Sequence, residues 1–191
     1  MQCFRVPIAV AEPFREEFVE DTLVREARSG DRIALARLLA PHQGSLFSLC
    51  LDVLGHAQDA EDAVQETYLR ALNGLSQFRG DSSVRTWLFR IAVRVCLDGK
   101  RARRPSVPLD EDLISAERCP ELTALDRSWI DNILSSLMPR HRAILLLKEW
   151  QGFSTAEIAA VMGWKVRKVH NELYQVRKVI AELLEREGDI P

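Results

Sequence analysis

The stretch GFSTAEIAAVMGWKVRKVHNELYQVRKVIAELLE, residues 152–185, decides the fold. It begins with a capping box, because Ser154 can accept a hydrogen bond from the backbone of Glu157 while the Glu157 side chain reaches back. A short helix through Val161 is expected to meet Gly163 at a turn, and a long helix follows. The apolar residues of this second helix step by three and four positions and predict one buried stripe: Val166, Val169, Leu173, Val176, Ile180 and Leu183. Two helices joined in this way form a helix-turn-helix.

The face opposite this stripe carries side chains suited to base edges and phosphates. Its members are Arg167, Asn171, Tyr174, Gln175 and Lys178, with Lys168 beside them. Asn and Gln can bond bidentately to adenine, Arg to guanine, and Lys to phosphate. A solvated charged helix is the usual explanation for such a face, but the turn, the capping box and the amides together favour binding in a DNA major groove. Glu172 could accept from a cytosine amino group, but it lies nearer the core edge, and we expect it to pair with His170 or Lys168.

The remaining segments also favour helices. Almost all show a helical period, and no run alternates as a half-buried strand does, so the predicted fold class is all-α. Residues 105–121 combine prolines and acids without a sustained apolar stripe, and we interpret them as a flexible acidic linker. This predicts an N-terminal extension at 1–20, one small helical domain at 21–104 and a second at 122–187.

The composition excludes several functional classes. The net charge is only -2, yet acids and bases are concentrated in separate segments. The four cysteines and four histidines are scattered, and no phosphate loop, catalytic triad or metal-ligand spacing occurs, so we expect no enzyme, cofactor or metal. Pro7 and Pro13 interrupt the N-terminal apolar run and acids follow it, unlike a signal peptide or membrane span, which predicts a cytoplasmic protein.

Residues 59–75, DAEDAVQETYLRALNGL, predict an amphipathic helix with Asp59 as its N-cap. Its expected buried face consists of Val64, Tyr68, Leu72 and Leu75. Asp62 and Glu66 then share an outward face beside Gln65. Two carboxylates at this spacing could hold a metal or act as acid and base, but no third ligand completes such a site. A solvated acidic face and a docking surface for a basic partner both remain open.

Residues 79–104 concentrate arginines around aromatic rings. The expected core stripe consists of Val84, Leu88, Ile91, Ala92 and Val95. Arg90, Arg94 and Arg101 share another side that Trp87 borders. Cations that follow phosphates and a ring that stacks on an unpaired base suit single-stranded nucleic acid. Arginines that merely cover the core would give the same pattern, and this stretch alone favours neither interpretation.

Several separated motifs occur in the order typical of one family. They are EARSGDRIALARLLAPH (26–42), DAEDAVQETYLRAL (59–72), FRGDSSVRTWLFRIA (78–92), LDGKRARR (97–104) and LMPRHRAILLLKEWQGFSTAEIAAVMGW (137–164). Over residues 21–187 the chain resembles the two-domain, extracytoplasmic-function (ECF) type of the sigma-70 family, the bacterial initiation factors that give core RNA polymerase its promoter specificity.

The resemblance implies a role for each surface. Asp62, Gln65 and Glu66 would bind the coiled coil of the polymerase's largest subunit, and the second domain would bind near its flap. The promoter -10 element would contact Trp87, Arg90, Arg94 and Arg101. The -35 element would contact Arg167, Lys168, Asn171, Tyr174, Gln175 and Lys178. The resemblance further implies an anti-sigma protein, often membrane-anchored, that holds the factor inactive until a stress signal.

Two departures from the family pattern stand out. Arg94 occupies a position where the family commonly has Asn, and Asn171, Glu172 and Gln175 replace a Ser-Arg pair followed by another Arg. A stand-alone helix-turn-helix regulator and a sigma-mimicking adaptor that sequesters an anti-sigma protein are the alternative functions.

Overall fold

A computed structural model describes residues 13–102 and 124–186 of the 191-residue chain. Every regular element within these two ranges is helical, which confirms the all-α prediction. The first range contains α1 (Pro13–Arg28), α2 (Arg32–Leu39), α3 (Gln43–Leu54), α4 (Ala57–Gly74) and α5 (Val84–Ala102), with short 3-10 turns at Ala40–His42 and Leu75–Gln77. The second contains α6 (Ala124–Ser136), α7 (Pro139–Glu149), α8 (Thr155–Met162) and α9 (Val166–Arg186). The predicted linker at 105–121 lies outside the described residues.

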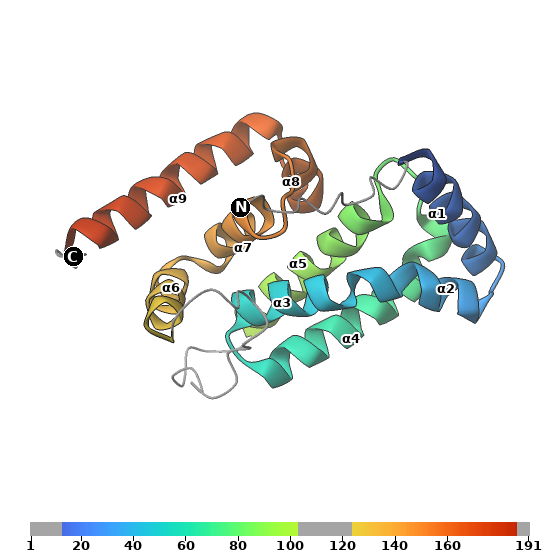
Figure 1. Cartoon of the computed structure of the whole chain (residues 1–191), viewed down its shortest axis with the longest axis horizontal. Coiled ribbons are helices and arrows are strands. Elements are labelled where there is room, and N and C mark those ends of the chain that lie inside the picture. Colours follow the sequence, from blue (N-terminus) through green and yellow to red (C-terminus); the bar gives the residue numbers. More distant parts are fainter. Residues whose placement is uncertain (1–12, 103–123, 187–191) are drawn as a thin grey trace, which may run out of the picture.

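The N-terminal half is built around α3, α4 and α5, which pack against one another (Figure 1). Small residues at Ala60, Ala63 and Ala71 on α4 are buried and allow this close approach. Leu72 is 53% exposed, contrary to prediction, because it follows Ala71 and is rotated about 100° away from the buried face.

The start of α4 differs from the prediction. The helix begins at Ala57, so His56 and not Asp59 occupies the N-cap position. Asp59 lies in the first turn, where a carboxylate interacts favourably with the positive end of the helix dipole. The acid was correctly associated with the helix start, but it lies three residues after the N-cap position.

Helix α1 also runs across the domain boundary expected at residue 21. The Glu20 side chain accepts a hydrogen bond from the Val84 backbone N–H at 3.0 Å, at the first residue of α5. Arg28, the last residue of α1, donates to the backbone oxygens of Leu75, Ser76 and Phe78. These contacts hold α1 against the N-terminal half even though its sequence lacks a strong apolar period.

The C-terminal half contains the predicted helix-turn-helix. The capping box is present: Glu157 N–H donates to Ser154 Oγ at 3.2 Å, and the Ser154 N–H donates to a Glu157 carboxylate oxygen at 2.8 Å. Gly163 ends α8 with φ +67°, a conformation that glycine adopts without steric cost. Val166 is 42% exposed, contrary to prediction, because α9 begins there, ahead of the turns that pack on the other helices.

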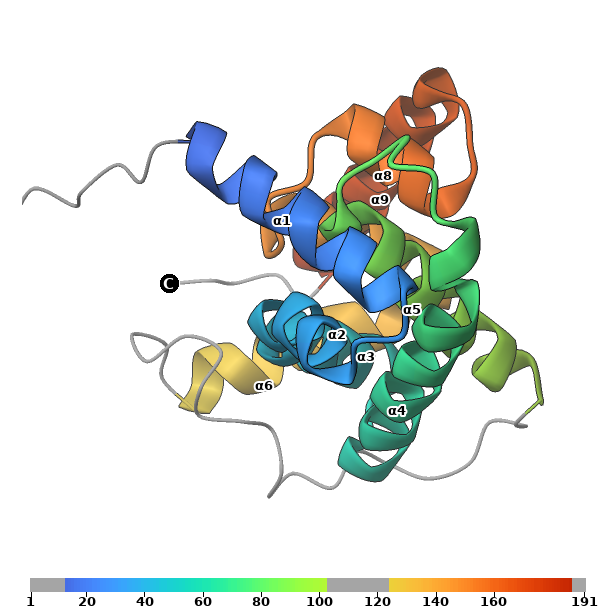
Figure 2. The same cartoon turned by 90° about the vertical axis from the view of Figure 1, so that its right-hand side faces the viewer.

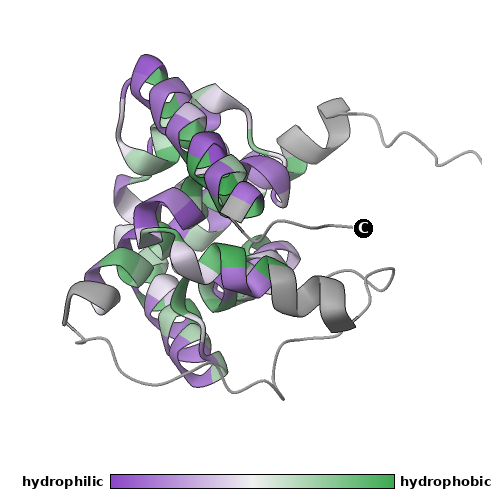
Figure 3. Cartoon of the chain, turned by 90° about the vertical axis from the view of Figure 1, so that its left-hand side faces the viewer, coloured by the Kyte–Doolittle hydropathy of each residue, from purple (hydrophilic) through white to green (hydrophobic). Residues whose placement is uncertain are grey.

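The buried stripe of α9 is otherwise as expected in its central part. Val169, Leu173 and Val176 are buried, while Ile180 and Leu183 are half-buried. In Figure 3, hydrophobic and hydrophilic residues alternate along the same helices, as expected for helices packed by one face.

The two halves pack directly against each other. Helix α8 lies on α5 and α7 lies on α3, so segments far apart in the sequence are neighbours (Figures 1 and 2). Phe89 of α5 and Phe153, just before α8, are fully buried, with ring centroids 4.9 Å apart. A continuous cluster of buried apolar side chains therefore extends through both halves. None of the described helices is both long and apolar enough to cross a membrane.

Candidate polymerase and nucleic-acid interfaces

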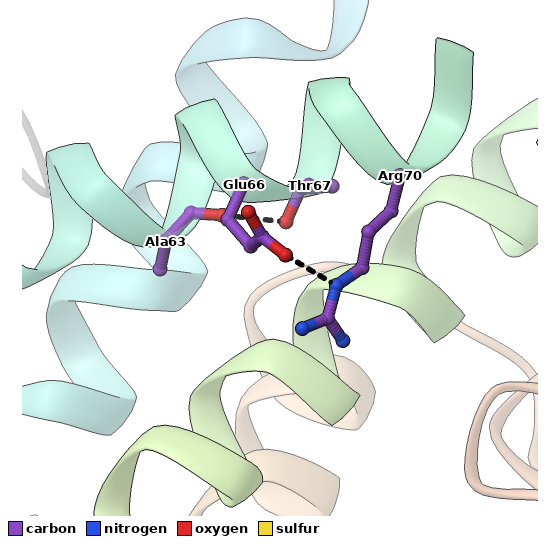
Figure 4. A network of polar contacts seen from close by, with 4 residues as sticks. All are labelled: Ala63, Glu66, Thr67 and Arg70. Atoms are coloured by element: carbon purple, nitrogen blue, oxygen red, sulfur yellow. Dashed lines mark hydrogen bonds and ion pairs between the residues drawn. The ribbon is translucent and has the colours of Figure 1, made fainter. Parts of the chain in front are cut away.

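The acidic face predicted on residues 59–75 lies on the outside of α4. Asp62 and Gln65 are exposed, and Glu66 beside them is half-buried. The Glu66 carboxylate accepts a hydrogen bond from Arg70 Nε at 2.6 Å, one helical turn further on (Figure 4). The helix thus brings the three predicted side chains to one surface, and the arginine partly neutralises it.

Apolar side chains adjoin this acidic face. Leu69 and Leu72 are 56% and 53% exposed. Thr67, on the buried side, donates its hydroxyl to the Ala63 carbonyl at 2.7 Å (Figure 4). The face combines carboxylates with accessible apolar surface, a combination suited to docking another protein. No group of three His, Cys, Asp or Glu side chains within the described ranges is placed to hold a metal ion.

The side chains predicted to bind the -10 element are in different environments. Trp87 is half-buried, its ring centroid lying 5.0 Å from that of Phe78. Arg90 donates from Nε to the Ala160 carbonyl of α8 at 2.8 Å, so it contacts the other half of the chain. Arg94 is exposed, and Arg101 has its side chain outside the described residues.

The face predicted to bind the -35 element is assembled on α9. All six of its side chains are exposed: Arg167, Lys168, Asn171, Tyr174, Gln175 and Lys178. Tyr174 is 67% exposed, a high value for an aromatic residue. Lys168 Nζ lies 4.1 Å from the centroid of the Trp164 ring, and Lys178 Nζ lies 3.7 Å from a Glu182 carboxylate oxygen. These contacts leave the amides and the tyrosine accessible to a ligand.

Glu172 has a different partner from the two that we predicted. Its carboxylate lies 2.8 Å from Nε2 of His141 on α7, and neither His170 nor Lys168 is involved in this pair. The cause is the packing of α9 on α7, which brings the core edge of α9 against a buried histidine. Sequence periodicity placed Glu172 near that edge but carried no information on the facing helix.

Three functional candidates have no counterpart in the sequence predictions. Arg85, Arg142 and Phe153 form contacts between the two halves. Burial lowers the pKa of both Arg85 and Arg142. An arginine that faces a backbone carbonyl has the same sequence signature as one that faces solvent or DNA, so only the tertiary structure reveals these residues.

Both halves match known protein families. Residues 38–105 match the model of Sigma-70 region 2, and residues 127–184 match that of Sigma-70 region 4. The ECF RNA polymerase sigma factor SigM of Mycobacterium tuberculosis is 31% identical over 173 residues, covering 89% of this chain and 87% of SigM. The ECF RNA polymerase sigma-E factor of Salmonella typhimurium is 32% identical over 181 residues, covering 86% and 94% of the two chains.

Solved structures share this arrangement of helices. CnrH, solved in complex with the cytosolic domain of CnrY, aligns with a TM-score of 0.69 and 28% identity, over 89% of this chain and 99% of CnrH. The sigma factor RpoE of Bartonella quintana, solved with the anti-sigma factor NepR, shares the fold with a TM-score of 0.62 and 21% identity, over 78% and 95% of the two chains. The chain therefore belongs to the ECF group of the sigma-70 family of RNA polymerase sigma factors and contains regions 2 and 4 of that family.

Proposed function

We propose that this sigma factor directs promoter-specific initiation through three separate surfaces. Asp62, Gln65 and Glu66 on α4 dock on the coiled coil of the polymerase's largest subunit. The exposed face of α9 binds the -35 element, and α5 captures unpaired bases of the -10 element. The polymerase supplies the chemistry, since the sigma factor itself is not an enzyme.

The observation that carries the proposal is the accessible face of α9. Six side chains predicted from their spacing to face a major groove all lie exposed on one helix, behind a capped α8 and a glycine turn. Two amides and an arginine on this face offer bidentate hydrogen bonds to bases.

The domain bounds of the proposal are those expected from the sequence, with one extension. Region 2 is assigned to residues 21–104 and region 4 to residues 122–187, and the acidic segment 105–121 joins them. Helix α1 extends the N-terminal half back to Pro13.

The -10 role is assigned to Trp87, Arg90, Arg94 and Arg101. The half-buried Trp87 has one ring side against Phe78, which would fix the indole for stacking on a base. Arg94 is exposed on the same helix and would follow the phosphates.

An anti-sigma protein is the proposed regulator, and the cytoplasm is the proposed location. The relatives CnrH and RpoE were each solved with a second protein, in the latter case an anti-sigma factor. The exposed leucines Leu69 and Leu72, next to the acidic face, offer such a partner apolar surface beside the polymerase site.

Binding to core RNA polymerase, followed by fluorescence anisotropy of the labelled chain, tests the docking assignment. Asp62→Ala/Glu66→Ala should weaken binding at least tenfold, because both carboxylates face the basic partner. Asp21→Ala/Glu26→Ala is the matched control, since it removes two exposed acids from α1 and changes the net charge equally. Equal affinities for both double variants would contradict the assignment.

DNA binding separates the sigma factor from a stand-alone regulator. Holoenzyme should select a defined promoter from a randomised duplex pool, while the chain alone should select none. Asn171→Ala should relax selection at one position, since a bidentate amide contributes about 1–3 kcal/mol of base discrimination. Tight, specific binding by the chain alone would instead favour the stand-alone regulator.

A further inference from the structure

Glu172 lies at the edge of the α9 face assigned to the -35 element, yet its carboxylate is bound to another helix. It lies 2.8 Å from Nε2 of His141, in the first turn of α7. The Glu172 and His141 side chains are only 21% and 11% exposed. An ionised carboxylate accepts hydrogen bonds and donates none, so the hydrogen of this bond belongs to Nε2. The charge on the acceptor makes the bond stronger than one between neutral groups.

The position of Glu172 along α9 gives this bond its importance. Asn171, just before it, is exposed and is assigned to a base, whereas Leu173, just after it, is buried in the core. Successive residues of a helix are about 100° apart around its axis, so Glu172 lies between these two faces. A bond at Glu172 therefore restrains the rotation of α9 about its own axis.

The other contacts between α7 and α9 restrain this rotation less. The buried stripe of α9 is apolar, and apolar attraction has no preferred direction, unlike a hydrogen bond. Arg177 and Glu149 form an ion pair between the same two helices, but it is longer, at 3.5 Å, and its side chains are 66% and 47% exposed. Exposed ion pairs contribute little. Of these two polar contacts, the one at Glu172 is the stronger restraint.

A small rotation of α9 is enough to affect base recognition. A helix with its side chains is about 10–12 Å across, so a rotation of about 10° moves its outer atoms by about 1 Å. A hydrogen bond of about 2.9 Å is lost when its atoms lie about 3.6 Å apart. The bidentate bond expected from the Asn171 amide to a base therefore requires α9 to keep its rotational setting.

We propose that His141 is a positioning residue for -35 recognition. By holding Glu172, it fixes the rotation of α9 at which Asn171 meets its base. His141 is 9% exposed and acts through Glu172, without touching DNA itself. The inference rests on the proposed -35 role of α9. It also gives Glu172 a role other than direct contact with a cytosine, because the carboxylate is already engaged by α7.

Promoter discrimination by the holoenzyme tests this role. The promoter selected by the wild type is compared with promoters that carry one substituted base pair in the -35 element, and Asn171→Ala identifies the pair that this amide reads. His141→Ala and Glu172→Ala should each reduce discrimination at that same pair by about fivefold or more. The double variant should lose no more than either single variant, because both substitutions break one bond.

Conservative variants separate positioning from a loss of packing. His141→Gln, whose amide can donate to the same carboxylate, should retain most of the discrimination. Glu172→Gln, which keeps an acceptor of the same length, makes the same comparison from α9, where truncation leaves the core intact. Circular dichroism and urea midpoints verify that each variant is folded.

Glu149→Ala is the matched control. It removes one acid, as Glu172→Ala does, and breaks the exposed ion pair with Arg177 between the same two helices. Its discrimination should stay within about twofold of that of the wild type. A pair that merely stabilises the packing would instead lower the affinity for all promoters by one factor. Unchanged discrimination ratios in His141→Ala and Glu172→Ala would therefore overturn the positioning role.

The remaining outcomes separate this inference from the proposed function. Relaxed discrimination in Glu172→Ala but not in His141→Ala would show that the acid reads a base directly, and would overturn the inference alone. A wild-type holoenzyme that selects no -35 sequence, or an Asn171→Ala variant that relaxes no position, would contradict the proposed function of α9 and this inference with it.

Discussion

Replacing Arg142 with methionine tests how much one arginine contributes to the junction between regions 2 and 4. Methionine retains much of the apolar volume and removes the guanidinium that donates to Val53 at 3.1 Å. Weaker donations to Leu137 at 3.4 Å and Asp52 at 3.5 Å are lost as well. The Val53 carbonyl would then remain in a buried site without its charged donor.

The expected cost follows from these contacts. A hydrogen bond from a charged donor contributes about 1.5–3 kcal/mol. The two longer bonds add little, and removal of a buried charge whose Nε has no hydrogen-bond partner recovers part of the loss. We expect a net destabilisation of about 2 kcal/mol, which corresponds to about 30-fold more frequent opening of the contact.

Native-state hydrogen exchange read by mass spectrometry measures this opening. Peptides that cover the C-terminal turn of α3 should exchange about 30-fold faster in Arg142→Met. Arg140→Met, an exposed neighbour on α7, is the matched control and should change stability by less than about 0.5 kcal/mol. Exchange within threefold of the wild type in Arg142→Met would show that this arginine does not hold the two regions together in solution.

Three further predictions concern single sites. Ser154→Ala should lower the free energy of unfolding by about 1 kcal/mol in urea titrations, because the capping box loses its acceptor; an unchanged midpoint would contradict this. Burial lowers the pKa of His42 and outweighs the nearby Glu20 carboxylate, which raises it. The unfolded state therefore binds a proton before the folded state does as the pH falls below about 6.5. Stability should therefore decrease from pH 7.5 to 5.5, and less so in His42→Gln; parallel urea midpoints in both proteins would refute the linkage. The hydrogen bond from Cys96, with burial, raises the pKa of Cys50, and iodoacetamide should label neither thiol in the folded protein; rapid labelling found by peptide mapping would be the opposite result.

Local sequence signals predicted the elements that local physics determines. The capping box and Gly163 are recognisable because a helix end must satisfy its own backbone groups within a few residues. The central stripe of α9 was equally predictable, since Val169 and Leu173 recur with the helical period. The start of α4 was misplaced by three residues because an acid favours both the cap and the first turn.

The candidate site was only partly predictable for a different reason. Whether Arg90 contacts a carbonyl, solvent or DNA depends on what lies opposite, and the helical period carries no information on that. Glu172 illustrates the same limit, because its partner His141 is 31 residues away in the sequence. Residues 13–20 of α1 were assigned to the N-terminal extension because the charged sequence of this helix has a weak apolar period, and its observed polar contacts to residues 75–84 are long-range.

The packing of α8 on α5 joins two parts of one polypeptide, so the two sides of this junction associate within a single molecule. A tether turns association into an intramolecular event with an effective concentration in the range of about millimolar. The junction can therefore stay closed even if its two sides, as separate fragments, would dissociate at micromolar concentrations. A single cut between residues 103 and 123 would abolish that advantage without altering any contact described at the junction, and protein dilution would then open it.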